Sequence, residues 1–174
     1  MTIQELEQII EIYGKSIYSF CLQLTRNNNA TDDLYQETWL IACRNIKKIN
    51  HSENVKSYLL SVAIGIWKNQ KRKYAWRNRI APQEELFENT AIEKLDVEQD
   101  GLTYYLEEER DKAVNEAISK LDDKYKIPIL LFYMEEMSLK EIAGALNIPE
   151  GTVKSRLSYA RKWLEKELED YINE

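Results

Sequence analysis

Two stretches of this chain combine cationic side chains with groups that can recognise nucleic-acid bases. In the first, residues 67–79, Lys and Arg alternate with Trp67, Tyr74 and Trp76. Cations of this kind neutralise phosphates, and aromatic faces stack on unpaired bases for about 1–3 kcal/mol each. A basic helix end with its aromatic rings in a core is the alternative, which we favour for Trp67 but not for Trp76. The side chains expected to meet DNA here are Asn69, Arg72, Lys73, Trp76 and Arg77.

The second stretch, residues 138–162, has the pattern of a helix-turn-helix. Ser138 and Glu141 have the spacing of a capping box, which satisfies free N–H groups at a helix start. Asn147 stands where a tight turn needs a left-handed residue, and Pro149 fits the first position of a second helix. Ala143 is small enough to let that second helix cross closely.

The second helix of this pattern has an apolar face and a basic face rich in hydroxyl groups. Such a face suits the major groove of DNA. An ordinary helical hairpin with a solvated face is the alternative, and the joint occurrence of all these signals favours DNA reading over it. The side chains expected to meet duplex DNA are Thr152, Lys154, Ser155, Arg156, Ser158, Tyr159, Arg161 and Lys162.

Composition limits the fold class and the kinds of function. The 174 residues include only five Gly and three Pro, and no alternating β-branched runs, so we expect an all-α protein. The net charge is −6, but residues 46–80 hold nine basic and one acidic residue, whereas residues 81–109 hold one basic and ten acidic residues. Two nucleic-acid surfaces separated by an acidic segment that repels DNA are therefore plausible.

No residue pattern indicates catalysis, a metal site or a cofactor. Cys21 and Cys43 lack metal-site or redox spacing, so we expect both to be small core residues. His51 is the single histidine, and no nucleophile and base stand at a specific spacing. Because there is neither a long apolar run nor a signal-peptide pattern, we expect a cytoplasmic protein that is not inserted in a membrane.

Apolar periodicity predicts two helical domains, residues 1–80 and 107–174, joined by an acidic flexible linker over residues 81–106. In the first domain we expect helices over residues 3–25, 32–46 and 55–79, with Thr31 as the N-cap of the second helix and Asp32 and Asp33 in its first turn. In the second domain we expect helices over residues 107–121 and 125–137, with Pro128 in the first turn of the latter, ahead of the helix-turn-helix.

The helix predicted over residues 32–46 carries a mixed acidic and apolar face. A docking surface for a partner protein and a solvated face with one stray apolar residue explain it equally well. The residues of the face, together with the neighbouring carboxylate, are Asp32, Asp33, Gln36, Glu37 and Leu40.

Three segments resemble the extracytoplasmic-function class of the sigma-70 family of bacterial sigma factors. Residues 32–40, D-D-L-Y-Q-E-T-W-L, are similar to the core-binding motif D-L-x-Q-E-x-[FW]-L of region 2. Residues 55–63, V-K-S-Y-L-L-S-V-A, and the basic stretch after them resemble the promoter-melting part of the same region. Residues 150–162, E-G-T-V-K-S-R-L-S-Y-A-R-K, closely resemble the region 4 pattern E-G-T-V-K-S-R-L-x-R-A-R.

The resemblance implies a specificity subunit of RNA polymerase. Its first domain would bind the clamp of the largest core subunit through residues 32–40 and would recognise and melt the minus-ten element, with Asn50, His51 and Ser52 near a flipped base. Its second domain would read the minus-thirty-five element and sit on the flap of the second-largest subunit, and the linker would run towards the RNA exit path. Many relatives are held inactive by an anti-sigma protein, which is a further candidate partner.

The sequence departs from the family pattern at two places. Ile64 and Gly65 stand where the family usually has Arg-Asn, which affects how the middle of region 2 packs or melts DNA. Tyr159 stands where Arg is usual, so a bidentate contact to guanine is replaced by one hydroxyl and a ring. A stand-alone helix-turn-helix regulator with an N-terminal sensing or dimerisation domain is the alternative function, but it does not explain residues 67–79.

Overall fold

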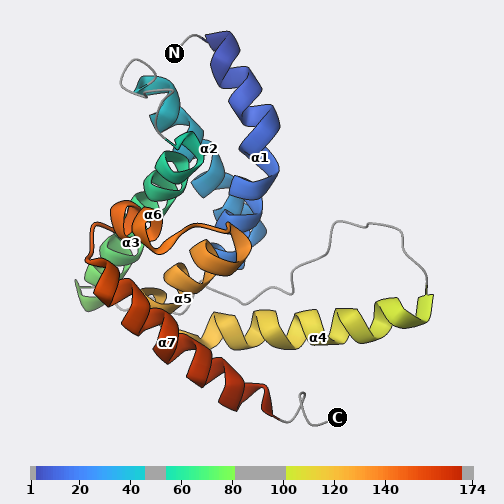
Figure 1. The fold of residues 1–174 in the computed structure, drawn as a ribbon. Helices are drawn as coiled ribbons and strands as arrows, with labels where there is room; N and C mark the ends of the chain where they lie inside the picture. Colours follow the sequence, from blue (N-terminus) through green and yellow to red (C-terminus); the bar gives the residue numbers. More distant parts are fainter. Residues whose placement is uncertain (1–2, 46–53, 81–100, 170–174) are drawn as a thin grey trace. The chain divides into compact units, whose positions relative to one another are not determined.

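The structure, a computed structural model, describes residues 3–45, 54–80 and 101–169, and every regular element within these ranges is a helix (Figure 1). The predicted all-α class is therefore confirmed. The chain divides into two compact units, residues 1–92 and residues 93–174, which are described separately below.

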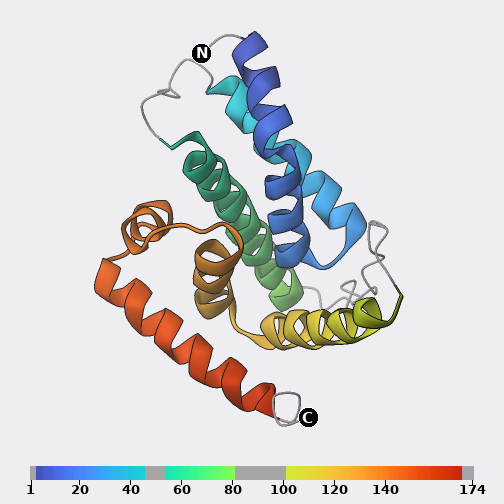
Figure 2. The same ribbon diagram turned by 45° about the vertical axis from the view of Figure 1, so that its right-hand side comes forward.

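Unit 1 is a three-helix bundle of α1 (Ile3–Thr25), α2 (Asn28–Arg44) and α3 (Val55–Ile80), in which each helix packs against the other two (Figure 2). The apolar periodicity of each helix supplies one face to a shared core. Fully buried apolar members of this core are Ile17, Phe20, Cys21, Leu34, Ala42, Leu59, Leu60 and Ala63.

The start of α2 differs from the prediction, because Asn27 and not Thr31 is its N-cap. Asn27 has an extended backbone, and its side-chain oxygen accepts a hydrogen bond from the Ala30 N–H at 3.0 Å. Thr31 is fully buried, and its hydroxyl donates to the Asn27 carbonyl oxygen at 2.8 Å and lies 2.6 Å from the Thr25 hydroxyl. Asp32 and Asp33 consequently come after the first turn of the helix.

Two other predictions for unit 1 have opposite outcomes. Trp67 is 6 % exposed and belongs to the core, as expected, and Ile64 is buried as well. Cys21 is buried, but Cys43 is exposed, so the prediction for Cys43 was wrong. Cys43 follows the buried Ala42 directly and is thereby rotated about 100° away from the buried stripe of α2.

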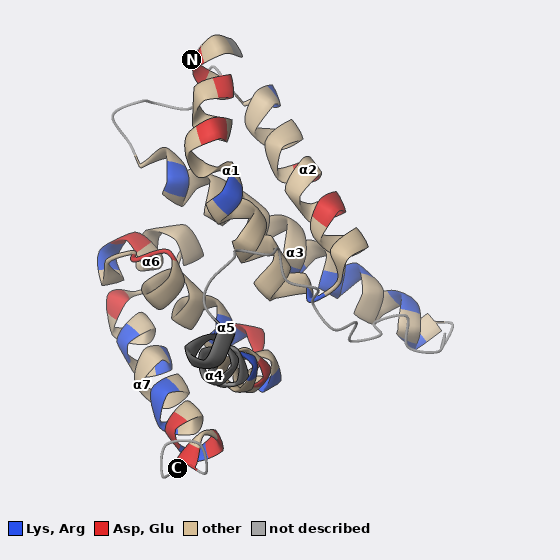
Figure 3. Cartoon of the chain, turned by 90° about the vertical axis from the view of Figure 1, so that its right-hand side faces the viewer, with Lys and Arg blue, Asp and Glu red and all other residues tan. Residues whose placement is uncertain are grey.

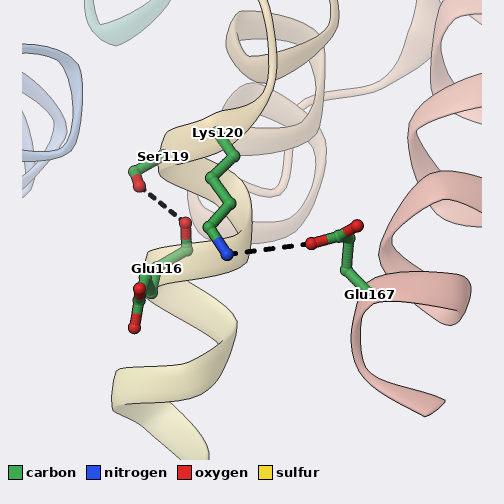
Figure 4. A network of polar contacts seen from close by, with 4 residues as sticks. All are labelled: Glu116, Ser119, Lys120 and Glu167. Carbon is green, nitrogen blue, oxygen red and sulfur yellow. Dashed lines mark hydrogen bonds and ion pairs between the residues drawn. The ribbon is translucent and has the colours of Figure 1, made fainter.

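Unit 2 contains α4 (Gly101–Lys120), α5 (Asp123–Ile129), a π-helical segment η1 (Leu130–Met134), α6 (Leu139–Leu146) and α7 (Glu150–Glu167). Helix α7 packs on α4, α5 and α6. Lys120 at the end of α4 also lies 3.8 Å from the Glu167 carboxylate at the end of α7 (Figure 4). The buried apolar residues of this unit include Ala117, Leu121, Ile127, Leu131, Ile142, Val153, Leu157 and Ala160.

The helices of unit 2 begin at positions that differ from the prediction, in α4 and in α5. Helix α4 begins at Gly101, so residues 101–106 of the predicted linker are helical, while residues 81–100 lie outside the described part of the chain. Apolar spacing places Val114 with Ala117 on the inward face of α4, but Val114 is 38 % exposed. Helix α5 begins at Asp123, which places Pro128 beyond its first turn. Proline lacks an N–H for the helical ladder, and the helix passes into the π-helical segment directly afterwards and ends before Met137.

The helix-turn-helix has the local structure that its sequence predicts, apart from one position. The Ser138–Glu141 capping box is present, with the Ser138 N–H donating to the Glu141 carboxylate at 2.8 Å. Asn147 ends α6 in the left-handed conformation, with φ 52°. Pro149 is the N-cap of α7 and not its first residue, because its backbone is extended and its carbonyl accepts from the N–H groups of Thr152 and Val153.

Candidate nucleic-acid interface

The face of α7 opposite its buried stripe carries the basic and hydroxyl side chains predicted to meet DNA. Burial of Val153, Leu157 and Ala160 fixes which side of α7 faces the core of unit 2. Lys and Arg residues therefore gather along the middle of α7 (Figure 3). Of the predicted residues, Lys154, Ser155, Ser158, Tyr159, Arg161 and Lys162 are exposed, and Thr152 and Arg156 are partly buried.

Tyr159 is held against α5 by another tyrosine. Its ring stacks on that of Tyr125, with centroids 4.2 Å apart and an angle of 23° between the planes. The Lys124 ammonium lies 4.8 Å from the centroid of the Tyr125 ring. Tyr159 is still 50 % exposed, so the stack fixes its ring without burying it.

Arg161 is held by the π-helical segment. Its Nε–H donates to the Tyr133 hydroxyl at 2.8 Å, and its guanidinium lies 5.5 Å from the Phe132 ring centroid and 5.7 Å from that of Tyr133. Neither Tyr125 nor Tyr133 carries a sequence signal that predicts these contacts. They are 34 and 28 positions from their partners in α7, so no local spacing could have indicated the pairing.

The C-terminal part of α3 leaves the core after Trp67. Trp76 is 63 % exposed, and Asn69, Arg72, Lys73 and Arg77 are exposed as well. Arg72 donates to the Asn69 side-chain oxygen at 2.6 Å, one turn earlier in the same helix. The Lys and Arg residues of this stretch are drawn in blue at the end of α3 in Figure 3. The predicted site residues Asn50, His51 and Ser52 lie outside the described residues.

Helix α2 presents the predicted docking face to the outside. Asp33, Gln36, Glu37 and Leu40 are all exposed, Leu40 by 56 %, and their spacing puts them on one side of the helix. The Gln70 amide of α3 donates to the Glu37 carboxylate at 3.3 Å. This face of α2 therefore borders the basic end of α3.

Asp32 lies beside the docking face and interacts with α1. The Tyr18 hydroxyl donates to the Asp32 carboxylate at 3.0 Å. Burial, followed by this hydrogen bond and the negative charge of Asp32, raises the pKa of Tyr18 above its ordinary value. Asp32 therefore forms a hydrogen bond to α1, which sets it apart from Asp33 and Glu37 on the docking face.

Within the described part of the chain, no three or more His, Cys, Asp or Glu side chains are grouped so that they could hold a metal ion. Over the same residues, no helix is both long and apolar enough to cross a bilayer. The chemistry that the exposed side chains offer is charge, hydrogen bonding and aromatic stacking.

Comparison with known proteins finds two matching family models. Sigma-70 region 2 matches residues 9–77, and sigma-70 region 4 matches residues 111–164. These ranges contain α2, most of α3 and the helix-turn-helix.

Curated relatives and solved structures agree with the two models. The chain is 32 % identical over 166 residues to the ECF RNA polymerase sigma factor SigW of Bacillus subtilis, covering 93 % of this chain and 88 % of the relative. It is 29 % identical to SigM of the same species, covering 91 % and 92 %. The fold is similar to that of the sigma factor RpoE of Bartonella quintana, crystallised with the anti-sigma factor NepR, with a TM-score of 0.81, 20 % identity and coverage of 96 % and 98 %.

Proposed function

Because this chain belongs to the extracytoplasmic-function class of the sigma-70 family, we propose that it brings core RNA polymerase to promoters through three surfaces, one each on α2, α3 and α7. The protein is an alternative sigma factor that directs transcription initiation. Its family consists of DNA-binding transcription factors and not of enzymes. The assignment of surfaces and residues to steps of initiation is our proposal, as is its cytoplasmic location beside the polymerase.

The exposed face of α7 reads the minus-thirty-five element as duplex DNA. Lys154, Arg156 and Lys162 supply positive charge for phosphates, and Thr152, Ser155 and Ser158 supply hydroxyl groups for backbone or base edges. The N-terminal part of a recognition helix enters the major groove, and these residues lie in the first four turns of α7.

The end of α3 recognises and melts the minus-ten element. Arg72, Lys73 and Arg77 attract the backbone, while Trp76 offers an exposed aromatic face to a base that has left the duplex. Asn69 lies one turn before Arg72 and contributes an amide for a base edge. The segment with Asn50, His51 and Ser52 joins α2 to α3 and completes this site in the proposal.

The face of α2 with Asp33, Gln36, Glu37 and Leu40 binds the clamp of the largest core subunit. An exposed Leu40 next to acidic residues on the same helix face has the composition of a docking patch for a basic partner with an apolar pocket. Unit 2 sits on the flap of the second-largest subunit, and residues 81–100, which hold most of the acidic segment, connect the two DNA-binding units along the basic RNA exit path.

An anti-sigma protein is a further partner in this proposal. RpoE, whose fold this chain shares, was crystallised with the anti-sigma factor NepR, and a second similar structure, CnrH, was solved with the cytosolic domain of CnrY at a TM-score of 0.68 and 17 % identity. The stand-alone regulator considered above accounts for unit 2 alone, whereas the region 2 match assigns residues 9–77 to the same family.

One observation carries the proposal: an exposed polymerase-type docking face and an exposed basic, aromatic helix end border each other through the Gln70–Glu37 hydrogen bond. To test it, the purified protein is mixed with bacterial core polymerase, separated on a sizing column and assayed for transcription from a promoter library. Co-elution with promoter-dependent initiation is expected. Salt-sensitive DNA binding by the protein alone, without co-elution, would favour the stand-alone regulator.

A further inference from the structure

The tyrosine that replaces the family's usual arginine in α7 is built into a fixed aromatic pair. Tyr159 and Tyr125 stack at 4.2 Å with nearly parallel rings, and the stack joins α7 to the helix beneath it. One face of the Tyr159 ring is covered by this contact. Tyr159 is nevertheless 50 % exposed, so the part of its ring outside the stack remains open to DNA.

Tyr159 lies on the predicted DNA-reading side of α7. It follows Ser155 by four positions and Arg156 by three, so its side chain neighbours each of theirs on the helix surface. Tyr159 and Arg161 leave the helix about 200° apart, and each contacts a different aromatic residue of the α5–η1 segment. The contacts of Tyr159 and Arg161 therefore fix α7 against the α5–η1 segment on two sides of the helix.

The reachable part of Tyr159 matches one base better than the others. In the major groove, thymine exposes a 5-methyl group, and arginine is the side chain that pairs with both acceptors of guanine. An aromatic ring gains from contact with a methyl group, and tyrosine offers no second donor to guanine. The hydroxyl can donate or accept, so it discriminates little between bases.

We propose that Tyr159 is a specificity-determining residue that selects a thymine in the minus-thirty-five element through its 5-methyl group, and that Tyr125 is the positioning residue that holds it there. This inference rests on the proposed reading of duplex DNA by α7. It adds a base preference and a supporting residue to that proposal. Tyr125 acts through the stack and does not itself touch the base.

The test starts by selecting preferred sequences with holoenzyme from a duplex library randomised over the minus-thirty-five region. Each thymine of the selected sequence is then replaced in turn by deoxyuridine, which removes only the methyl group. We expect one position at which this replacement weakens binding about three- to fivefold, because burial of one methyl-sized group changes affinity by about fourfold. Replacing that thymine by 5-methylcytosine, with guanine opposite, should lose less affinity than replacing it by cytosine.

Variants of Tyr159 and Tyr125 test whether this stacked pair makes the contact with the methyl group. Tyr159→Phe keeps the ring and should keep the thymine-to-uracil ratio, whereas Tyr159→Ala should bring the ratio to about one. Tyr159→Arg should shift the selected base towards guanine. Tyr125→Phe should keep the ratio and Tyr125→Leu should lower it, and thermal unfolding of both confirms that the fold is intact.

Different outcomes contradict the thymine contact and the proposed reading of the minus-thirty-five element by α7. If wild-type holoenzyme selects no minus-thirty-five sequence, the proposed role of α7 fails and this inference fails with it. If a sequence is selected but no uracil replacement matters, or the ratio is unchanged in folded Tyr159→Ala, only the thymine contact is overturned. If Tyr125→Leu folds and keeps the full ratio, Tyr125 has no positioning role.

Discussion

The two basic surfaces of this chain are built in opposite ways. In α7, the side chains predicted to meet DNA lie opposite a buried stripe, and Tyr159 and Arg161 are each held by an aromatic ring of the α5–η1 segment. In α3, the basic stretch begins where the buried stripe stops, at Trp67, and Trp76 and Ile80 are more than 60 % exposed. The basic surface of α7 lies over the core of unit 2, whereas the basic end of α3 extends beyond the core of unit 1.

This difference fits the two tasks that we propose for the surfaces. Reading a duplex needs donors at fixed positions, because the base edges in the major groove are fixed relative to each other. Holding unpaired bases needs accessible aromatic faces and charge, because a melted strand can adjust to the protein. The comparison predicts that variants of α7 change sequence preference and duplex affinity, whereas variants at the end of α3 change strand opening.

The largest expected effect concerns the docking face of α2, because neither basic surface would act at a promoter if unit 1 did not bind the polymerase. Glu37→Lys should lower affinity for core polymerase about a hundredfold or more, because a cation then faces the complementary positive surface of the partner. Co-elution on a sizing column and fluorescence anisotropy measure the loss. Circular dichroism should show an unchanged helix content, since Glu37 is exposed.

Two controls separate docking from other effects of this change. Glu37→Gln retains an oxygen that can accept from Gln70 and should lose less affinity than Glu37→Lys. Glu11→Lys makes the same charge reversal at an exposed position of α1 and should bind normally. Normal polymerase binding by a folded Glu37→Lys protein would remove α2 from the docking assignment.

The next largest effect is expected at the exposed end of α3. Trp76→Ala should lower open-complex formation about tenfold or more and leave duplex binding by α7 nearly unchanged, because one stacked base is worth about 1–3 kcal/mol. Permanganate reactivity of the minus-ten thymines measures opening, and filter binding of a minus-thirty-five duplex measures α7. Trp76→Phe keeps an aromatic face and should retain most opening. Equal losses in both assays would show that Trp76 supports the fold and does not stack on a base.

The features that the sequence predicted correctly are those that neighbouring residues determine. The Ser138–Glu141 box, the left-handed Asn147 and the buried stripe of α7 each depend on groups within a few positions of each other. The start of α2 was missed although it is local, because Asn27 and Thr31 are both good N-caps and burial of Thr31 decided between them.

The features that the sequence did not predict depend on contacts between distant segments. The Tyr125–Tyr159 stack joins two helices, and each tyrosine alone resembles an ordinary surface residue. Ile64 was identified as a departure from the family pattern, but its 2 % exposure shows that it belongs to the core, where an arginine would be buried without water. Local sequence patterns thus predicted which side chains of α2, α3 and α7 are exposed, while tertiary packing determined which of them contact other segments.

The third prediction concerns charge on α7. Arg156→Ala should weaken binding to most duplex sequences by a similar factor and lower the slope of log affinity against log salt by about one, because one phosphate contact is lost. Titrations between about 50 and 200 mM salt measure the slope. Glu165→Ala, at an exposed position on the same helix, is the control and should leave the slope unchanged. A change of preference at one base pair would make Arg156 a base reader and would move it to the class proposed for Tyr159.

The smallest expected effect concerns Gly65, the other departure from the family pattern. Gly65 lies exposed inside α3, and a Cβ atom added there would meet nothing within 4 Å. Gly65→Ala should therefore stabilise the protein by about 0.5–1 kcal/mol, because glycine in a helix interior loses more conformational freedom on folding than alanine. Urea unfolding measures the gain, and Gly144→Ala, at an exposed and equally open position of α6, should give a similar one.

If Gly65→Ala stabilises the fold but reduces promoter opening, the α3 backbone must closely approach DNA or polymerase at this position. The functional surface of α3 would then begin before Trp67. If promoter opening is unchanged, the functional surface of α3 begins after Trp67, the last buried residue of the helix.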